Sequence, residues 1–212
     1  MNELLIYGAG GLGREIASSI SAFPDWQVRG FVDDNPALQT VDGFPVVGDI
    51  EWLKKIGAPI NLIVAVGDPV KKKKIVNQIK LIPNINYPTF VHPSATILNK
   101  LNVKIGKGSI ISAGCILTTN IEISKHVLIN LNVTIGHDVL IGEFSSIMPG
   151  ANVAGNVIVG NAVLIGSGAN ILNGLSLGDG SRVGAGAVVT RSVNAEITVV
   201  GIPAKDINSY NG

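Results

Sequence analysis

The chain has 212 residues, which allows one large domain or two small ones. Its formal net charge of +1 gives no reason to expect nucleic acid or an anionic membrane surface as a partner, and no apolar stretch approaches the roughly 18 residues of a membrane span. Hydrophobic residues make up 46% and aromatic residues only 5%, with 26 glycines, so the core must be built from small aliphatic side chains on a backbone that turns often.

The cysteine content and the first residues of the chain indicate the cellular compartment of the protein. The single cysteine, Cys115, excludes an intrachain disulfide and fits a reducing environment. The sequence after Met1 lacks the basic region and the long apolar region of a signal peptide. We therefore expect a cytoplasmic protein without a membrane partner.

Residues 1–85 have the pattern of alternating strands and helices. The predicted strands are residues 4–7, 27–32 and 61–66, and the predicted helices follow them around residues 16–20, 49–56 and 71–79. This order is typical of a Rossmann-like βαβαβ domain, one half of a doubly wound parallel sheet. The segment 83–93 contains three prolines and is the expected linker to a second domain, residues 86–212.

A glycine motif lies between the first predicted strand and helix. Gly8, Gly10 and Gly13 form G-x-G-x-x-G, and Asp33 lies twenty residues beyond Gly13. Such glycines admit a pyrophosphate to a helix N-terminus, and the acid binds a ribose hydroxyl. A full NAD domain needs a second half that residues 1–85 do not supply, so a sugar nucleotide fits better. The alternative is a tight turn without a ligand.

The third predicted strand leads into a second group of candidate residues. It ends at Gly67 and Asp68, at the edge where ligands gather in such sheets. Residues 71–74 are all lysine, which most often indicates a solvated helix face. The alternative is that Lys72 reaches a phosphate.

The rest of the chain follows a six-residue repeat. From Ile105 to Val189 every sixth residue is aliphatic, and a small or aliphatic residue usually stands four places later. Each hexapeptide predicts a short strand and a turn, and three units close one triangular coil of a parallel β-helix. A weaker series at Val91, Ile97 and Val103 extends the repeat upstream with a two-residue slip before Ile105. The spacing leaves the handedness open.

The chain has three histidines. His92 lies in the linker and is expected to be structural or exposed. His126 and His137 occupy turn places in their hexapeptides, so both are expected to point outward. Asp138 follows His137, and Gly155 holds the same place one coil later. A histidine beside a glycine amide can activate an amine while the amide receives a developing oxyanion.

Metal and thiol chemistry are not expected. A zinc site on such a helix needs several converging histidines, and His126 and His137 are eleven residues apart, out of phase with the eighteen-residue coil. Cys115 falls on an inward place of its hexapeptide and is expected to fill the core.

Motifs in both halves resemble one family. These motifs are residues 6–11, 31–34, 64–67, 135–138, 141–144, 154–156 and 200–205. In this order they resemble the bacterial sugar-nucleotide acetyltransferases related to the sialic acid O-acetyltransferases and the UDP-4-amino-sugar N-acetyltransferases. The resemblance runs the length of the chain. It implies a left-handed parallel β-helix, a homotrimer with its sites between neighbouring copies, and acetyl-CoA as cosubstrate.

The resemblance also implies roles for individual residues. His137 would be the general base, Asp138 would orient it, and the Gly155 amide would hold the thioester carbonyl. Asn130 matches a position near the sugar. The nucleotide sugar, expected to be UDP-linked, would be held by Gly8, Gly10, Gly11, Asp33, Asp34, Gly67 and Lys72. The final coils with Gly201 and Lys205 would line the acetyl-CoA channel.

Two departures from the family pattern concern the acceptor sugar, because Leu12 and Ser146 replace histidines common in relatives. The expected reaction is N-acetylation of a nucleotide-linked amino sugar for bacterial surface glycans. Three alternatives stay open: a sugar O-acetyltransferase of the sialic acid type, an NAD-dependent oxidoreductase with a trimerising β-helix, and a structural β-helix without activity.

Overall fold

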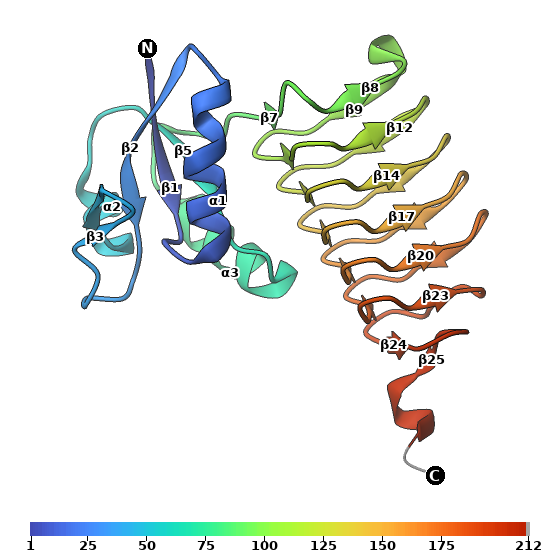
Figure 1. Ribbon diagram of the computed structural model, residues 1–212. Coiled ribbons are helices and arrows are strands. Elements are labelled where there is room, and N and C mark those ends of the chain that lie inside the picture. Colours follow the sequence, from blue (N-terminus) through green and yellow to red (C-terminus); the bar gives the residue numbers. More distant parts are fainter. Residues whose placement is uncertain (211–212) are drawn as a thin grey trace. The chain divides into compact units, whose positions relative to one another are not determined.

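A computed structural model describes residues 1–210 of the chain (Figure 1). Two compact units divide the chain, Met1–Pro88 and Thr89–Gly212. Within the described residues, no helix has the length and apolar character needed to cross a membrane.

The first unit is built on a six-stranded sheet in the order β3-β4-β2-β1-β5-β6. Its strands are β1 (Asn2–Tyr7), β2 (Trp26–Val32), β3 (Thr40–Val41), β4 (Phe44–Gly48), β5 (Ile60–Val64) and β6 (Ile85–Asn86). Its helices are α1 (Gly11–Ser19), α2 (Ile50–Lys55) and α3 (Pro69–Ile79), with a 3-10 turn at Ile20–Ala22. Because β1 pairs in parallel with both β2 and β5, the predicted βαβαβ core is confirmed.

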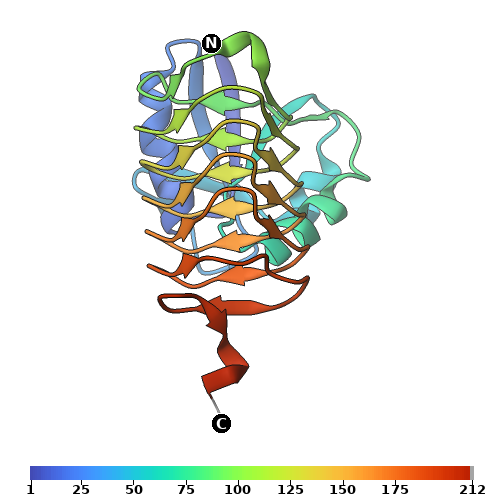
Figure 2. The same ribbon diagram turned by 90° about the vertical axis from the view of Figure 1, so that its right-hand side faces the viewer.

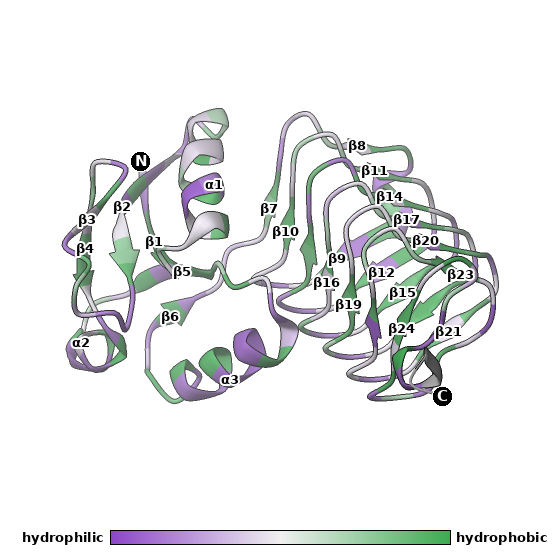
Figure 3. Cartoon of the chain, turned by 60° about the horizontal axis from the view of Figure 1, so that its bottom comes forward, coloured by the Kyte–Doolittle hydropathy of each residue, from purple (hydrophilic) through white to green (hydrophobic). Residues whose placement is uncertain are grey.

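Local sequence explains these elements. The apolar residues Leu4, Leu5 and Ile6 are at most 1% exposed, as expected for a central parallel strand covered on both faces. Helix α3 begins with a proline in its first turn, and the Asp68 carboxylate caps it by accepting a hydrogen bond from Lys71 N at 2.9 Å. A run of four lysines separates the apolar residues at the start and end of α3, and Figure 3 shows polar residues in purple and apolar residues in green.

Two parts of this sheet were not predicted. Strand β4 extends the sheet by pairing in parallel with β2, and β3 folds back on β4 through a turn in which Asp42 and Gly43 both have positive φ. Strand β6 adds two residues beside β5. The predicted linker therefore contributes one strand to this sheet before the second unit begins at Thr89.

The second unit is a parallel β-helix with three faces, and Figures 1 and 2 show its coils stacked in chain order. The first face holds β7 (Phe90–Val91), β10 (Ile110–Ile111), β13 (Leu128–Ile129), β16 (Ser146–Ile147), β19 (Leu164–Ile165), β22 (Arg182–Val183), β24 (Thr198–Val200) and β25 (Lys205–Asp206). The second face holds β8 (Thr96–Ile97), β11 (Ile116–Leu117), β14 (Thr134–Ile135), β17 (Asn152–Val153), β20 (Asn170–Ile171) and β23 (Val188–Val189). The third face holds β9 (Val103–Ile105), β12 (Ile121–Ile123), β15 (Leu140–Ile141), β18 (Ile158–Val159) and β21 (Ser176–Leu177).

Strand register confirms the predicted period. Ile129 pairs with Ile147, and Ile147 pairs with Ile165, so equivalent residues are eighteen apart. In the first coil Val91 pairs with Ile111, twenty residues away. The two extra residues of the predicted slip lie in a 3-10 turn at Lys100–Asn102. From β9 through β23 the paired strands are eighteen residues apart, and the last coil is two residues shorter, since Val183 pairs with Val199.

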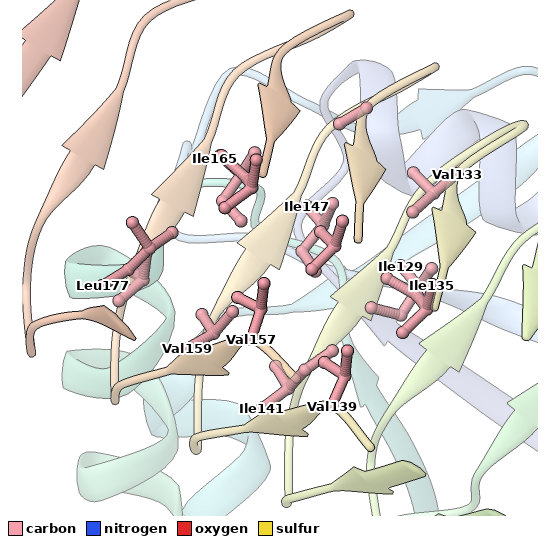
Figure 4. Close-up of a cluster of buried hydrophobic side chains, with 14 of the residues drawn as sticks. Ile129, Val133, Ile135, Val139, Ile141, Ile147, Val157, Val159, Ile165 and Leu177 are labelled. Atoms are coloured by element: carbon pink, nitrogen blue, oxygen red, sulfur yellow. The ribbon is translucent and has the colours of Figure 1, made fainter. Parts of the chain in front are cut away.

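The interior of the β-helix is an aliphatic ladder (Figure 4). Ile129, Ile135, Ile141 and Ile147 come from successive strands and are at most 1% exposed. Their removal from water on every coil is the main stabilising contribution. Cys115 is fully buried in this ladder, as predicted, and its Sγ donates to Asn130 O at 3.0 Å. Burial raises the pKa of the Cys115 thiol, which keeps it protonated.

Candidate active site

His137 lies in the turn between β14 and β15, where the second and third faces meet. We call residues 136–139 the His137 corner. The His137 side chain is 57% exposed, and its Nδ1 lies 2.7 Å from Asp138 Oδ2. Because a carboxylate only accepts hydrogen bonds, Nδ1 carries the proton in neutral imidazole. The lone pair is therefore on Nε2, which makes Nε2 the basic atom of the corner.

Asp138 is held by two partners. Besides His137, its carboxylate accepts a hydrogen bond from Asn120 Nδ2, at 3.1 Å from Oδ1. The hydrogen bond with His137 and then the one with Asn120 lower the pKa of Asp138 below its usual value, so it is ionised at neutral pH. The sequence did not single out Asn120.

Gly155 lies directly against the His137 ring. A Cβ built on Gly155 would be 2.5 Å from both Cε1 and Nε2 of His137. Any side chain at residue 155 would therefore displace the imidazole. The absence of a side chain at Gly155 is a steric requirement for this position of the ring.

The Gly155 amide differs from its counterparts at another corner of the β-helix. There, Glu143 N donates to Asn161 Oδ1 at 2.9 Å, and Asn161 N donates to Asp179 Oδ1 at 2.7 Å. Gly155 O accepts from Gly174 N, but across residues 1–210 no acceptor is found for Gly155 N–H. A peptide N–H without an acceptor, in the glycine that the imidazole covers, is suited to receive a developing oxyanion.

Asn130 is at a different corner of the same coil. It directly follows β13, between the first and second faces, whereas His137 follows β14. Its side chain is 4% exposed, and its Oδ1 accepts from Leu131 N at 2.7 Å. One chain therefore does not bring Asn130 to the His137 corner. Gly201 and Lys205 belong to the last coil: Gly201 directly follows β24, and Lys205 is the first residue of β25.

The glycine motif of the first unit lies at the carboxyl edge of its sheet. A Cβ on Gly13 would collide with Gly8 O, so Gly13 allows α1 to pack against the end of β1. Gly10 caps α1 without a side-chain hydrogen bond, and a Cβ on Gly10 or Gly11 would meet nothing within 4 Å. The α1 N-terminus therefore has open space above it, where the helix dipole and free N–H groups favour an anion.

The Asp33 carboxylate connects segments of the chain at this edge of the sheet. Its two carboxylate oxygens accept hydrogen bonds from Ala9 N at 2.8 Å and Asn35 N at 2.9 Å. The carboxylate thus joins the end of β2 to the glycine-rich turn. A carboxylate has about four lone-pair sites, so Asp33 retains capacity for a ribose hydroxyl as well.

Asp34 has structural partners too. Its carboxylate accepts from Tyr7 Oη at 2.7 Å and from Ile50 N at 3.1 Å. Burial, followed by the bond to Asp34, raises the pKa of Tyr7, which remains a neutral donor. Asp33 and Asp34 also line a cavity of about 240 Å³ at this edge, together with Asn35, Gly48 and Asp49.

Gly67 and Lys72 lie near the end of β5 at the same edge. Gly67 stands between β5 and α3. Lys71, Lys73 and Lys74 are exposed, as expected of a solvated face, but Lys72 is 3% exposed. Burial lowers the pKa of the Lys72 ammonium to about 7, and Asp68 acts in the opposite direction. Near neutral pH, Lys72 is therefore present in both its charged and its neutral form.

The remaining singled-out residues have simpler environments. His126 lies outside the aliphatic core, as expected of a turn place, but it is only 8% exposed because its ring stacks on Phe144 with centroids 5.5 Å apart. His92 Nδ1 lies 2.8 Å from Ser94 Oγ. Leu12 is half-buried in α1, and Ser146 is fully buried on β16. Within residues 1–210, no three His, Cys, Asp or Glu side chains converge as a metal site would require.

Comparisons with known protein families match both units. The model described as the PglD N-terminal domain matches residues 3–79, and the model described as bacterial transferase hexapeptide (six repeats) matches residues 138–173 and 156–191. No curated protein sequence is significantly similar to the chain.

Solved structures are similar over almost the whole chain. The acetyltransferase domain of PglB from Neisseria gonorrhoeae FA1090, in complex with acetyl coenzyme A, is 31% identical with a TM-score of 0.88, covering 98% of this chain and 100% of that one. WeeI from Acinetobacter baumannii AYE is 30% identical with a TM-score of 0.84 and the same coverage. PerB from Caulobacter crescentus, in complex with CoA and GDP-perosamine, is 30% identical with a TM-score of 0.87 over 97% of each chain.

A Rossmann-like unit followed by a left-handed parallel β-helix of hexapeptide repeats defines a class of acetyltransferases, and the predicted fold is confirmed. Within this class, the chain belongs to the bacterial sugar-nucleotide acetyltransferases. It is an acetyltransferase, and its acetyl donor is acetyl-CoA.

Proposed function

We propose that the chain transfers the acetyl group of acetyl-CoA to the amine of a nucleotide-linked amino sugar, with UDP as the expected nucleotide and His137 as the general base. One observation carries this proposal: Nδ1 of His137 is bonded to Asp138 at 2.7 Å, while Nε2 lies against the bare α-carbon of Gly155. The relative crystallised with CoA and GDP-perosamine supports an amino-sugar acceptor. The product would serve the synthesis of bacterial surface glycans.

The reaction is a direct transfer between two bound substrates. The sugar amine attacks the thioester carbonyl, forming a C–N bond, while His137 Nε2 accepts a proton from the nitrogen. The Gly155 N–H donates to the oxyanion, and Asp138 stabilises the imidazolium. When the C–S bond breaks, the proton on His137 passes to the departing thiolate. The products are the N-acetylated sugar nucleotide and free CoA.

The first unit would hold the nucleotide. Its open α1 N-terminus at Gly10 and Gly11 offers N–H groups and a positive dipole end to the diphosphate. Asp33 and Asp34 would take ribose hydroxyls beside the cavity they line. Gly67 lies at the same edge, and a phosphate that reaches Lys72 would favour its charged form, because an adjacent anion raises the pKa of an ammonium.

The complete site would form between copies of the chain in a homotrimer. The exposed position of His137 and the placement of Asn130 at another corner both support a site that takes residues from two copies. Exposed aliphatic residues also support an interface between copies, since Ile116, Leu140 and Ile158 are 43–50% exposed on a single chain. Gly201 and Lys205 in the last coil would contact the acetyl-CoA.

The test measures CoA thiol release with UDP-, GDP-, CMP- and dTDP-linked 4-amino sugars, comparing the native chain with His137→Ala. We expect turnover with the UDP sugar, and a loss of about 10²–10⁴-fold in kcat for His137→Ala, the usual contribution of a general base. Acetyl-CoA affinity and a solution mass of three chains should be unchanged, because the His137 side chain is exposed and is not part of the buried core.

Three results would each contradict one part of the proposal. Near-native kcat in His137→Ala would remove the general-base assignment while leaving the acetyltransferase activity in place. Activity confined to a GDP, CMP or dTDP sugar would reject UDP and keep the mechanism. A hydroxyl sugar accepted in preference to every amino sugar would reject the N-acetyl acceptor.

A further inference from the structure

A column of polar side chains runs along the β-helix and ends at the His137 corner. Asn102, Asn120 and Asp138 are eighteen residues apart and occupy the same place in three successive coils. Asn102 Nδ2 donates to Asn120 Oδ1 at 3.1 Å, and Asn120 Nδ2 donates to Asp138 Oδ1 at 3.1 Å. The last member of the column is His137, whose Nδ1 lies 2.7 Å from Asp138 Oδ2.

The bonds of this column have a fixed direction. Because Asn120 Oδ1 accepts from Asn102, the Asn120 amide presents its Nδ2 to the next coil. A flipped amide would set its oxygen against the Asp138 carboxylate, and two acceptors would then face each other. Asn102 thus selects the amide orientation that Asp138 needs.

The backbone of the turns keeps the column in register. Asn120 has φ 54° and Asp138 has φ 60°, a left-handed conformation that Asn and Asp adopt more readily than most residues. Asp138 N donates to Thr119 O at 3.1 Å, which ties one turn to the next. The two side chains are therefore brought together by the coil spacing itself.

An exposed aspartate needs such a second anchor. The Asp138 side chain is 46% exposed, and an aspartate in solvent exchanges among staggered rotamers. Its bond to His137 alone fixes one oxygen. The bond from Asn120 fixes the other, so only one rotamer satisfies both partners.

We propose that Asn120, oriented by Asn102, is a positioning residue for acetyl transfer. It holds Asp138 so that Oδ2 keeps His137 protonated on Nδ1 and leaves Nε2 as the base. Asn120 acts through Asp138. This inference rests on the proposed role of His137, and it adds a requirement that the role alone does not contain.

The main test is Asn120→Gly, because glycine accepts the positive φ at residue 120 without strain and removes only the donor. We expect kcat to fall about tenfold, in the range of a lost hydrogen bond to a charged group at an exposed site, with KM for both substrates within about twofold. The matched control is Asn132→Gly, which replaces an asparagine with φ 56° at the corner between β13 and β14. Its kcat should stay native.

Two further measurements separate positioning from a general loss of structure. In an Asp138→Ala background, Asn120→Gly should have no additional effect on kcat, because the residue through which it acts is gone. The second measurement is the tautomer of His137 in ¹⁵N-histidine NMR spectra, which contain signals from only three histidines. In Asn120→Gly, His137 should change from the Nδ1–H tautomer to a mixture of both tautomers.

The outcomes are distinct from those for the proposed function. If His137→Ala is inactive but Asn120→Gly has native kcat and a native tautomer, the positioning role is overturned and the general base stands. Full additivity of Asn120→Gly and Asp138→Ala would also overturn it. If His137→Ala is active, the failure belongs to the proposed function.

Discussion

The imidazole of His137 and the α-carbon of Gly155 are packed so closely that a methyl group on Gly155 would lie 2.5 Å from both Cε1 and Nε2 of the ring. The same glycine supplies a peptide N–H for which the described residues provide no acceptor. In the proposed mechanism, Gly155 would therefore set both the position of the base and the site for the oxyanion.

Gly155→Ala tests this relationship. The added methyl group must displace the imidazole, because the Gly155 backbone is fixed to the next coil through Gly174 N. We expect kcat to fall by at least about 10²-fold, the scale of a 1 Å misplacement of a catalytic group, while the thermal unfolding temperature changes little. Steady-state kinetics and circular dichroism measure the two effects.

Gly57→Ala is a suitable control for this substitution. A Cβ on Gly57 would meet nothing within 4 Å, so alanine should be accepted there with native kcat. Native activity in Gly155→Ala would show that the ring adopts another position during catalysis.

Asp138→Asn tests the tautomer of His137. An asparagine amide at residue 138 can donate to Nδ1, which would favour the proton on Nε2 and remove the basic lone pair. We expect kcat to fall about 10- to 100-fold, less than for a buried triad because the Asp138 side chain is 46% exposed. Steady-state kinetics at saturating substrates give the loss.

The matched variant is Asp138→Glu, which keeps a carboxylate. It should retain activity within about tenfold of the native chain, because the acceptor for Nδ1–H is preserved. Equal activity in Asp138→Asn and the native chain would mean that the hydrogen bond at Nδ1 does not control the base.

Much of the fold could be predicted because the β-helix interior requires an aliphatic residue on every sixth place. Ile129, Ile147 and Ile165 are buried by the same geometry, so one rule predicts all of them. The β3–β4 hairpin was missed although Asp42-Gly43 is a turn signal, because Phe44–Gly48 is short and contains Pro45. Strand β6 depends on pairing with β5, which a local pattern does not contain.

The candidate site was predictable to a similar degree. The eighteen-residue coil places Gly155 beside His137. The same spacing counted backward from Asp138 leads to Asn120, which was not among the predicted site residues. Burial of His126 and Lys72 could not be predicted, since turn position and a run of four lysines do not indicate which side chains other elements cover.

Asp33→Asn tests the closure of the glycine-rich turn. Asparagine has one acceptor oxygen, so it can keep the bond to Ala9 N or to Asn35 N but not both. We expect UDP affinity to fall about tenfold and the stability of the first unit to fall by about 1–2 kcal/mol. Isothermal titration calorimetry and urea unfolding give these values.

Acetyl-CoA affinity should be unchanged in Asp33→Asn, because the proposed CoA residues belong to the second unit. The control is Asp25→Asn, because the Asp25 side chain is exposed and makes no hydrogen bond among the described residues. Native UDP affinity in Asp33→Asn would show that the nucleotide binds elsewhere.

Lys72 gives the chain a predicted pH dependence of stability. Its folded pKa of about 7 lies below the ordinary lysine value of 10.5, so between these values the unfolded chain binds more protons than the folded one. The Lys72 contribution to the free energy of unfolding therefore rises as pH increases from about 7 toward 10 and is constant below pH 7. Lys72→Met should remove this rise, which is on the order of 1–3 kcal/mol.

Urea unfolding of the native chain and Lys72→Met at pH 6, 8 and 9.5 measures the difference. Lys73→Met is the control, because Lys73 is exposed on the same helix and its removal should leave the pH dependence native. A rise with pH that persists unchanged in Lys72→Met would mean that another group titrates in this range.

If a phosphate of bound UDP contacts Lys72, it would favour the charged ammonium. The native chain should then take up protons when it binds UDP at pH 8, and Lys72→Met should not.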